Sequence, residues 1–146
     1  MNAYESAVSV TTMDDIFAGQ LMTSDLCTVA PDTLVEEVAE TMLEAEIGSV
    51  LVVDGDNQLL GIVTTTDYVG IVAESRPKAE TTVEQYMTTD VITATPQDSI
   101  RDIADAMVEH GFHHVPVVSD PEGVIGILTT SDLAAYLSRV QTPSPS

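Results

Sequence analysis

The feature that most constrains the fold is an internal repeat. The stretch GILTTSD at residues 126–132 repeats GIVTTTD at residues 61–67. Alignment of 22–69 with 87–134 needs no gap and gives 16 identities over 48 positions. A stacked solenoid needs about three repeats or more. Two copies therefore predict two related halves paired about a pseudo-two-fold axis.

Each copy predicts the order β-α-β-β-α. A short extended piece (26–30 or 91–95) ends at a proline and precedes a helix. A nearly all-apolar strand (50–53 or 115–118), a turn and a second apolar strand follow, and a helix then starts at Thr66-Asp67 or Ser131-Asp132. Strands that are apolar on both faces are expected to be covered on both sides. The predicted class is α/β.

The first helix of each copy carries start signals and an apolar stripe. Thr33 with Glu36, and Ser99 with Asp102, have the spacing of a capping box. An apolar stripe at helical spacing is expected to be buried. The stripes consist of Val35, Val38, Met42 and Leu43 in the first copy, and Ile100, Ile103, Met107 and Val108 in the second.

The charge is strongly one-sided, with 24 acidic against four basic residues among 146 and a formal charge of −20. This balance argues against nucleic-acid binding, which needs clustered Lys and Arg, and against adsorption to an anionic membrane. Self-repulsion destabilises a compact fold in dilute buffer, but at molar salt the Debye length is only about 3 Å. The composition is typical of an acidic, halophilic protein, and we expect a salt-accumulating cytoplasm.

Targeting signals and disulfides are not indicated by the sequence. Cys27 is the single cysteine, the first ten residues lack a basic and apolar leader pattern, and no apolar run is long enough to span a bilayer. We expect a cytoplasmic protein with a flexible N-terminus (1–12), a first repeat domain (13–73), a linker (74–81), a second repeat domain (82–140) and a disordered tail (141–146).

The two motifs and their flanking elements resemble the CBS domain, named after cystathionine β-synthase. The pattern is Gly, two hydrophobic residues, Thr, two residues and Asp after a Val-rich strand, and each copy opens with MT-x-D-x-x-T at Met22 or Met87. The resemblance covers about residues 13–140. It implies a tandem pair that dimerises through helical faces, with two clefts that commonly bind AMP, ADP, ATP or S-adenosylmethionine.

The resemblance also implies roles for particular residues. Asp67 and Asp132, with Thr64 and Thr129 beside them, are expected to bind the ribose. Thr65 and Thr130 at helix N-termini, together with His113 and His114, are expected near phosphate. The second copy has these histidines where the first has Gly48-Ser49, so the two clefts are expected to differ. The implied adenine pockets comprise Thr28, Val29, Ala30, Val50 and Leu51, and Thr93, Ala94, Thr95, Val115 and Pro116.

Other interpretations of these residues stay open. Thr66 or Ser131 could cap a helix while the following aspartate only favours its positive end. His110, His113 and His114 form H-x-x-H-H, but we expect Gly111 to end the helix and predict no metal site. DGDN at 54–57 matches the start of a calcium loop but lacks its later ligands, so we expect an Asp-Gly hairpin turn. Cys27 has no histidine partner indicated and is expected to be a small buried residue.

The expected function is that of a regulatory module. We expect a stand-alone CBS pair that forms a homodimer, requires no cofactor, binds an adenosine-type ligand and signals to a partner protein through a population shift. The alternative is a ligand-free interaction or assembly module. No nucleophile, base and oxyanion set is found, so we do not expect an enzyme.

Overall fold

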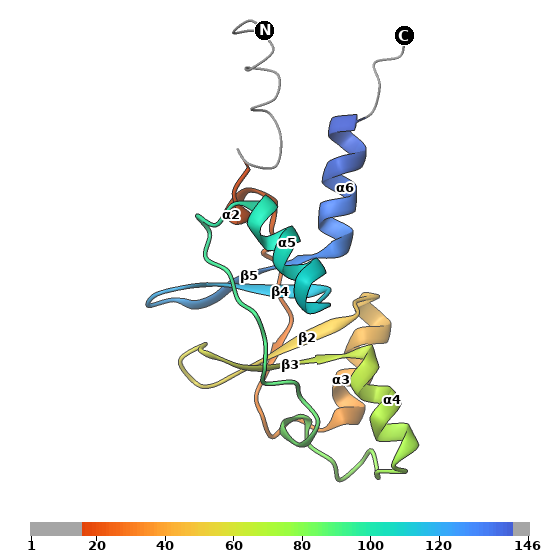
Figure 1. Ribbon diagram of the computed structural model, residues 1–146. Helices are drawn as coiled ribbons and strands as arrows, with labels where there is room; N and C mark the ends of the chain where they lie inside the picture. Colours follow the sequence, from red (N-terminus) through yellow and green to blue (C-terminus); the bar gives the residue numbers. More distant parts are fainter. Residues whose placement is uncertain (1–15, 142–146) are drawn as a thin grey trace, which may run out of the picture. The chain divides into compact units, whose positions relative to one another are not determined.

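The computed structural model describes residues 16–141 (Figure 1). The predicted mobile ends lie outside these residues, apart from Gln141, which is the last residue of α6. The α/β class with two repeats is confirmed. The elements are α2 (Ala18–Leu21), β1 (Thr28–Val29), α3 (Val35–Ala45), β2 (Ser49–Val53), β3 (Leu59–Thr64), α4 (Thr65–Ala73), η2 (Val83–Gln85), α5 (Ile100–His110), β4 (His114–Ser119), β5 (Gly123–Thr129) and α6 (Thr130–Gln141).

The chain forms two units whose limits differ from those of the sequence repeats. Unit 1 consists of Met1–Ser24, Ile92–Ser119 and Ile125–Ser146, and unit 2 of Asp25–Val91 and Asp120–Val124. The segment that precedes each repeat therefore belongs to the unit built on the other repeat.

Unit 2 contains a three-stranded sheet in the order β1-β2-β3. β1 runs parallel to β2, with Thr28 opposite Leu51, and β2 and β3 are antiparallel with an irregularity between Val52 and Val53. The core of unit 2 comprises Val35, Val38, Met42, Val50, Val52, Val63, Ile71 and Val83.

The connection between β2 and β3 comprises residues 54–58 and begins with the predicted Asp-Gly pair. Asp54 Oδ1 accepts hydrogen bonds from the amides of Asp56 and Gln58. The left-handed residue is Asn57 (φ 63°) rather than Gly55. The carboxylate of Asp54 therefore organises this turn from within.

Unit 1 contains β4 and residues 125–129 of β5, and the two strands pair as neighbours. Their connection is too short for a parallel crossover, so they form an antiparallel hairpin. The extended strand predicted at 91–95 is wrong in extent, because it is reduced to one parallel bridge between Ala94 and Val117. Around Ala94 the bonds Ala94 N to Pro116 O (2.9 Å) and Val118 N to Ala94 O (2.8 Å) form this pairing. The core comprises Ala18, Ala94, Ile100, Ile103, Met107, Val115, Val117, Leu128, Leu133 and Tyr136.

In unit 1, residues 16–23 complete the second repeat. Ala18 is fully buried in the core and its amide donates to the Asp98 carbonyl at 2.8 Å. Thr23 pairs with Ile127 through two backbone bonds of 2.9 and 3.0 Å. The short helix α2, which lies ahead of the first copy in the sequence, therefore serves the second copy.

In unit 2, residues 81–88 complete the first repeat in the same manner. Val83 is fully buried, and its amide donates to the Thr33 carbonyl at 2.8 Å. Thr88 pairs with Ile62 through backbone bonds of 2.8 and 2.9 Å. Each of these contacts has a counterpart in unit 1 between equivalent positions of the two copies. The structural repeat therefore begins earlier than the sequence repeat.

The predicted N-cap residue is confirmed for one helix and wrong for the other. Ser99 Oγ accepts from the Asp102 amide at 3.1 Å at the start of α5. In α3, however, the N-cap is Leu34, and Glu37 rather than Glu36 accepts from its amide (3.4 Å). Thr33 does not cap the helix because its carbonyl is already paired with Val83, which holds this residue in the extended segment.

The predicted apolar stripes are buried except for one residue in each helix. Leu43 is 79% exposed, and Val108, at the equivalent position of the second copy, is 85% exposed. One position beyond Met42 or Met107, each side chain turns about 100° away from the buried stripe. These two residues therefore lie on an outer helix face.

Candidate functional site

The candidate site in unit 2 centres on Asp67, in the first turn of α4. Its Oδ2 accepts from the Thr64 amide at 2.8 Å and from Thr64 Oγ1 at 3.3 Å, while its Oδ1 accepts from Thr88 Oγ1 at 3.3 Å. Thr64 is the N-cap residue. The side chains of Thr64, Asp67 and Thr88 are each partly exposed.

Unit 1 repeats this arrangement around Asp132, in the first turn of α6. Its Oδ2 accepts from the Thr129 amide at 2.9 Å and from Thr129 Oγ1 at 3.1 Å, and Thr129 Oγ1 accepts from the Asp132 amide at 3.2 Å. The Thr23 hydroxyl donates to Oδ1 at 3.4 Å. The contacts between Thr129 and Asp132 make a reciprocal capping box.

The structure corrects which residues start these helices. Thr64 and Thr129 occupy the capping positions, so the interpretation with Thr66 and Ser131 as caps is wrong. Asp67 and Asp132 each use one oxygen to stabilise the helix start, and Oδ1 lies outside the cap. A carboxylate has about four lone-pair sites. Each aspartate can therefore cap its helix and still accept hydrogen bonds from a ligand.

The glycine of the repeated motif is explained by a close approach. A Cβ at Gly61 would lie 2.8 Å from the Thr88 carbonyl oxygen and 2.9 Å from Met87 Cγ. A Cβ at Gly126 would lie 2.8 Å from Met22 Cγ. Where the MT-x-D segment of the other copy passes over the motif strand, a side chain at residue 61 would therefore meet backbone, and one at residue 126 would meet the Met22 side chain.

The residues predicted to contact phosphate differ between the two units. Thr65 and Thr130 are exposed at the starts of α4 and α6. The Thr130 amide donates to the His113 carbonyl at 3.1 Å, which brings the histidine segment to the start of α6. The matching bond in unit 2, from the Thr65 amide at 3.3 Å, goes to Gly48. Among residues 16–141, only unit 1 therefore has imidazoles beside its helix start.

The two histidines have different surroundings. His113 is exposed, whereas His114 is partly buried in β4. Burial lowers the pKa of His114, and the neighbouring charge of His113 lowers it further. His114 therefore favours the neutral form more than an exposed imidazole does.

Four of the five residues predicted for the first adenine pocket lie on β1 and β2, and Ala30 directly follows β1. Thr28 is paired opposite Leu51, while Val50 and Leu51 are each only 1% exposed. Val50 belongs to the core of unit 2, and Val29 packs against that core. The exposed residues of this set are Thr28 and Ala30.

In unit 1, three of the five predicted adenine residues line a cavity of about 230 Å³. Thr93, Ala94 and Val115 contribute to its wall, and Asp98 and Asp102 belong to the same lining. The other two predicted residues do not line it: Pro116 is buried next to Val115, and Thr95 is exposed.

A larger groove in unit 2, of about 440 Å³, is lined by α3, α4 and the residues that follow α4. It contains none of the residues predicted to bind a ligand. Its lining mixes apolar side chains with both signs of charge. The lining residues are Val35, Glu36, Ala39, Glu40, Leu43, Tyr68, Ile71, Val72, Ser75, Arg76 and Lys78.

Thr23 and Thr88 are the site residues that the sequence did not single out. They belong to the MT-x-D segments, which carry the resemblance but to which the sequence assigns no role. Each donates to the carboxylate of the motif in the other copy. Both threonines are identical positions of the repeat, which is the signal that could have found them. Their partners are distant in the sequence, 109 residues away for Thr23 and 21 for Thr88, so only the fold reveals the contact.

Two other kinds of site are raised by the sequence. Among residues 16–141, no group of three or more His, Cys, Asp or Glu side chains is arranged to hold a metal ion. Gly111 ends α5 in the left-handed conformation (φ 75°), as predicted.

Cys27 is partly buried, and burial raises the pKa of its thiol, which is opposite to the shift of an activated nucleophile. Within residues 16–141, no helix is long and apolar enough to cross a membrane.

The fold and the paired motifs define a tandem pair of α/β repeats, and comparison with known proteins identifies its class. The CBS domain family model matches residues 18–74 and 83–139. This chain belongs to the CBS domain family.

Relatives of this chain differ widely in length. An uncharacterized 17.7 kDa protein of Acidianus ambivalens is 35% identical over 123 residues, which are 84% of this chain and 74% of that protein. A homoserine O-acetyltransferase of Methanohalobium evestigatum is 29% identical over 123 residues, but these cover only 24% of the enzyme. The activity of that longer protein is therefore not attributed to this chain.

Among solved structures, the CBS domain pair of protein MJ0100 has a TM-score of 0.78 and 26% identity. The match covers 86% of this chain and 98% of that one. That protein was crystallised in complex with 5′-methylthioadenosine and S-adenosyl-L-methionine.

Proposed function

We propose that this chain is a regulatory CBS pair that binds an adenosine-type ligand through Asp67 and Asp132 and passes its state to a partner protein. The observation that carries the proposal is the repeated constellation at the two helix starts. In each, one carboxylate oxygen caps the helix and Oδ1 meets only a long hydrogen bond from a threonine. A ribose hydroxyl is a suitable donor to such an oxygen.

The ligand class is supported by the similar CBS pair that binds 5′-methylthioadenosine and S-adenosyl-L-methionine. Both compounds carry adenosine. We propose His113 and His114 as phosphate contacts for a nucleotide in unit 1, since the start of α6 also favours an anion. Unit 2 has Gly48-Ser49 in that place, so it is the better candidate for a ligand without phosphate.

A thermal-shift screen in molar KCl tests the proposal, with AMP, ADP, ATP with and without Mg²⁺, S-adenosylmethionine and 5′-methylthioadenosine. A ligand at 100 times its Kd stabilises the fold by about 2.7 kcal/mol. The shift should shrink in Asp67→Ala or Asp132→Ala and persist in Asp56→Ala, an exposed carboxylate in the β2–β3 turn. Cooperative melting without any shift would favour the alternative, a ligand-free assembly module.

We further propose that the chain forms a homodimer through the α3–α4 groove. Leu43, Val69 and Val72 are 79, 68 and 76% exposed on these helices. Glu36 and Glu40 line the groove together with Arg76 and Lys78, which are two of the four basic residues of the chain. A two-fold partner can place each copy's cations against the other's carboxylates.

The oligomeric state tests this interface. Leu43→Glu should convert a dimer into a monomer in light scattering after size exclusion, because it places a charge in an apolar contact. Val108→Glu is the matched change at the equivalent position of unit 1. Equal loss of the dimer in both variants would show that the interface is not confined to the α3–α4 face.

A further inference from the structure

The hydroxyls of Thr88 and Thr23 occupy the oxygens on which the proposed function depends. Thr88 Oγ1 lies 3.3 Å from Asp67 Oδ1, and Thr23 Oγ1 lies 3.4 Å from Asp132 Oδ1. Strong O–H···O bonds are usually about 2.5–3.0 Å long. Both contacts are therefore weak and can be exchanged for a better donor.

The lone pairs of Asp67 show what this exchange requires. Oδ2 already accepts two hydrogen bonds from Thr64, and Oδ1 accepts one from Thr88. Of about four acceptor positions, one remains open. A single hydroxyl can use it, but a vicinal diol donates two hydrogen bonds and needs a second position.

The bond from Thr88 is the one that can be released at least cost. The bonds from Thr64 hold the start of α4, and the backbone of Thr88 remains paired with Ile62 at 2.8 and 2.9 Å. Rotation of the Thr88 side chain alone would free the oxygen without moving the segment. The same count holds for Asp132, with Thr129 as the cap and Thr23 as the exchangeable donor.

We propose that Thr88 and Thr23 are internal competitors that set the affinity of each carboxylate for a vicinal diol. This inference rests on the proposed function and names the part of the ligand that each threonine opposes. A ligand with both ribose hydroxyls replaces the threonine, whereas a ligand with one hydroxyl binds beside it. Each threonine thereby weakens diol binding and leaves single-hydroxyl binding unchanged.

Calorimetric titration with adenosine and 2′-deoxyadenosine tests this competition. Both probes are uncharged, so the histidines and the net charge contribute little. Titrations use the Asp132→Ala background, in which only Asp67 can hold a diol. Thr88→Val should tighten adenosine about fivefold, or about 1 kcal/mol, and leave 2′-deoxyadenosine unchanged. Thr88→Ser keeps the hydroxyl and should resemble the parent, as should Thr89→Val at the exposed neighbouring residue.

The outcomes separate the inference from the function on which it rests. If adenosine binds the parent but Thr88→Val leaves its affinity unchanged or weakens it, the threonine does not compete and the inference is overturned. Equal tightening of both probes would also overturn it. If neither adenosine nor AMP binds the wild-type chain, the proposed function fails and the inference fails with it.

Discussion

Units 1 and 2 share their backbone contacts but differ sharply in charge. Unit 2 carries 16 acidic and two basic residues, a net charge of −14, whereas unit 1 carries eight and two, a net charge of −6. The hydrogen bonds that complete the two cores nevertheless join equivalent positions of the two copies. The backbone pattern and the buried apolar residues therefore specify the unit, while surface charge varies freely.

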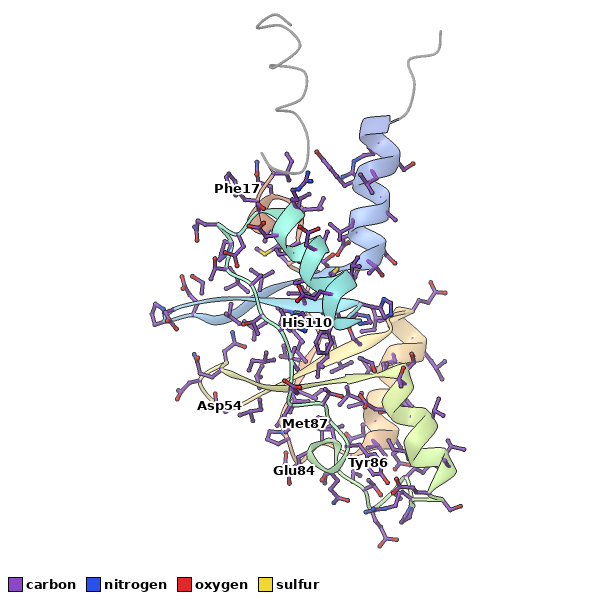
Figure 2. All side chains as sticks on the ribbon, in the orientation of Figure 1. Phe17, Asp54, Glu84, Tyr86, Met87 and His110 are labelled. Atoms are coloured by element: carbon purple, nitrogen blue, oxygen red, sulfur yellow. The ribbon has the colours of Figure 1, made fainter. Side chains whose placement is uncertain are left out.

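The segments that complete the cores also differ in their side-chain contacts. In unit 2, the Tyr86 hydroxyl donates to Glu74 at 2.7 Å and Arg76 donates to Gln85 at 2.7 Å. Figure 2 shows Tyr86 and Met87 on the segment that follows η2. The counterpart of Tyr86 in unit 1 is Leu21, which has no polar atom in its side chain. Unit 2 thus adds a polar contact beyond the end of α4 that Leu21 cannot make.

The strongest effect should be a salt dependence that differs between the units. At low salt, repulsion among like charges should destabilise unit 2 more than unit 1, and at molar salt screening should remove most of the difference. Hydrogen exchange at 0.2 and 3 M KCl measures this directly. Amides of β2 and β3 should lose protection at low salt before those of β4 and β5. An equal loss of amide protection in both sheets would show that the difference in net charge does not make the two units differ in stability.

The next effect compares the two motif glycines. Gly61→Ala places a Cβ against the Thr88 carbonyl, which is backbone, whereas Gly126→Ala meets only the flexible Met22 side chain. Overpacking costs about 1–3 kcal/mol, so we expect about 3 kcal/mol for Gly61→Ala and about 1 kcal/mol for Gly126→Ala in urea unfolding. In a Met22→Ala background, the destabilisation caused by Gly126→Ala should become smaller. An equal loss of unfolding free energy in Gly61→Ala and Gly126→Ala would contradict this difference between a backbone contact and a side-chain contact.

A smaller effect is expected at Tyr68, whose counterpart in unit 1 is the buried Leu133. The Tyr68 hydroxyl donates to the Val35 carbonyl at 2.7 Å. Burial, with a further contribution from the Asp67 charge, raises the pKa of Tyr68 to about 12, so the donor stays protonated. Tyr68→Phe should lower the free energy of unfolding by about 1 kcal/mol. An unchanged melting temperature would show that the bond adds nothing.

The weakest effect is a pH dependence confined to unit 1. Because the pKa of His114 is lower in the folded state than its ordinary value, protonation favours unfolding. Its contribution to stability is therefore complete above about pH 6.5 and is lost as the pH falls through the folded-state pKa. The stability difference between wild type and His114→Gln should shift in favour of the variant from pH 7.5 to 5.5. A constant difference would show that His114 is not the titrating group.

The sequence predicted the fold class and the motif helices because both depend on local periodicity and on a repeat within one chain. It did not predict that residues 16–23 complete the second repeat or that residues 81–88 complete the first. Those segments share identical residues at Gln20/Gln85, Met22/Met87 and Thr23/Thr88, but this match does not show which copy each segment completes. Their pairing uses backbone atoms, which leave no pattern in the side chains.

The candidate site was also predicted only in part, because the sequence displays local motifs but not contacts between distant segments. The aspartates and capping threonines form a local motif that the sequence displays. Thr88 and Thr23 contact those aspartates only after the chain has folded. The one-residue error at the start of α3 has a similar origin, because the pairing of Thr33 with Val83 is not local.

Whether the two aspartates hold the ligand is decided by calorimetric titration of the wild-type chain with AMP, and separately with adenosine, in molar KCl, repeated with Asp67→Ala and Asp132→Ala. We expect two sites of different affinity in the wild type and one in each variant, with the site on Asp132 favouring AMP over adenosine more strongly. Binding that survives unchanged in both variants, or no binding at all, would contradict the proposed function.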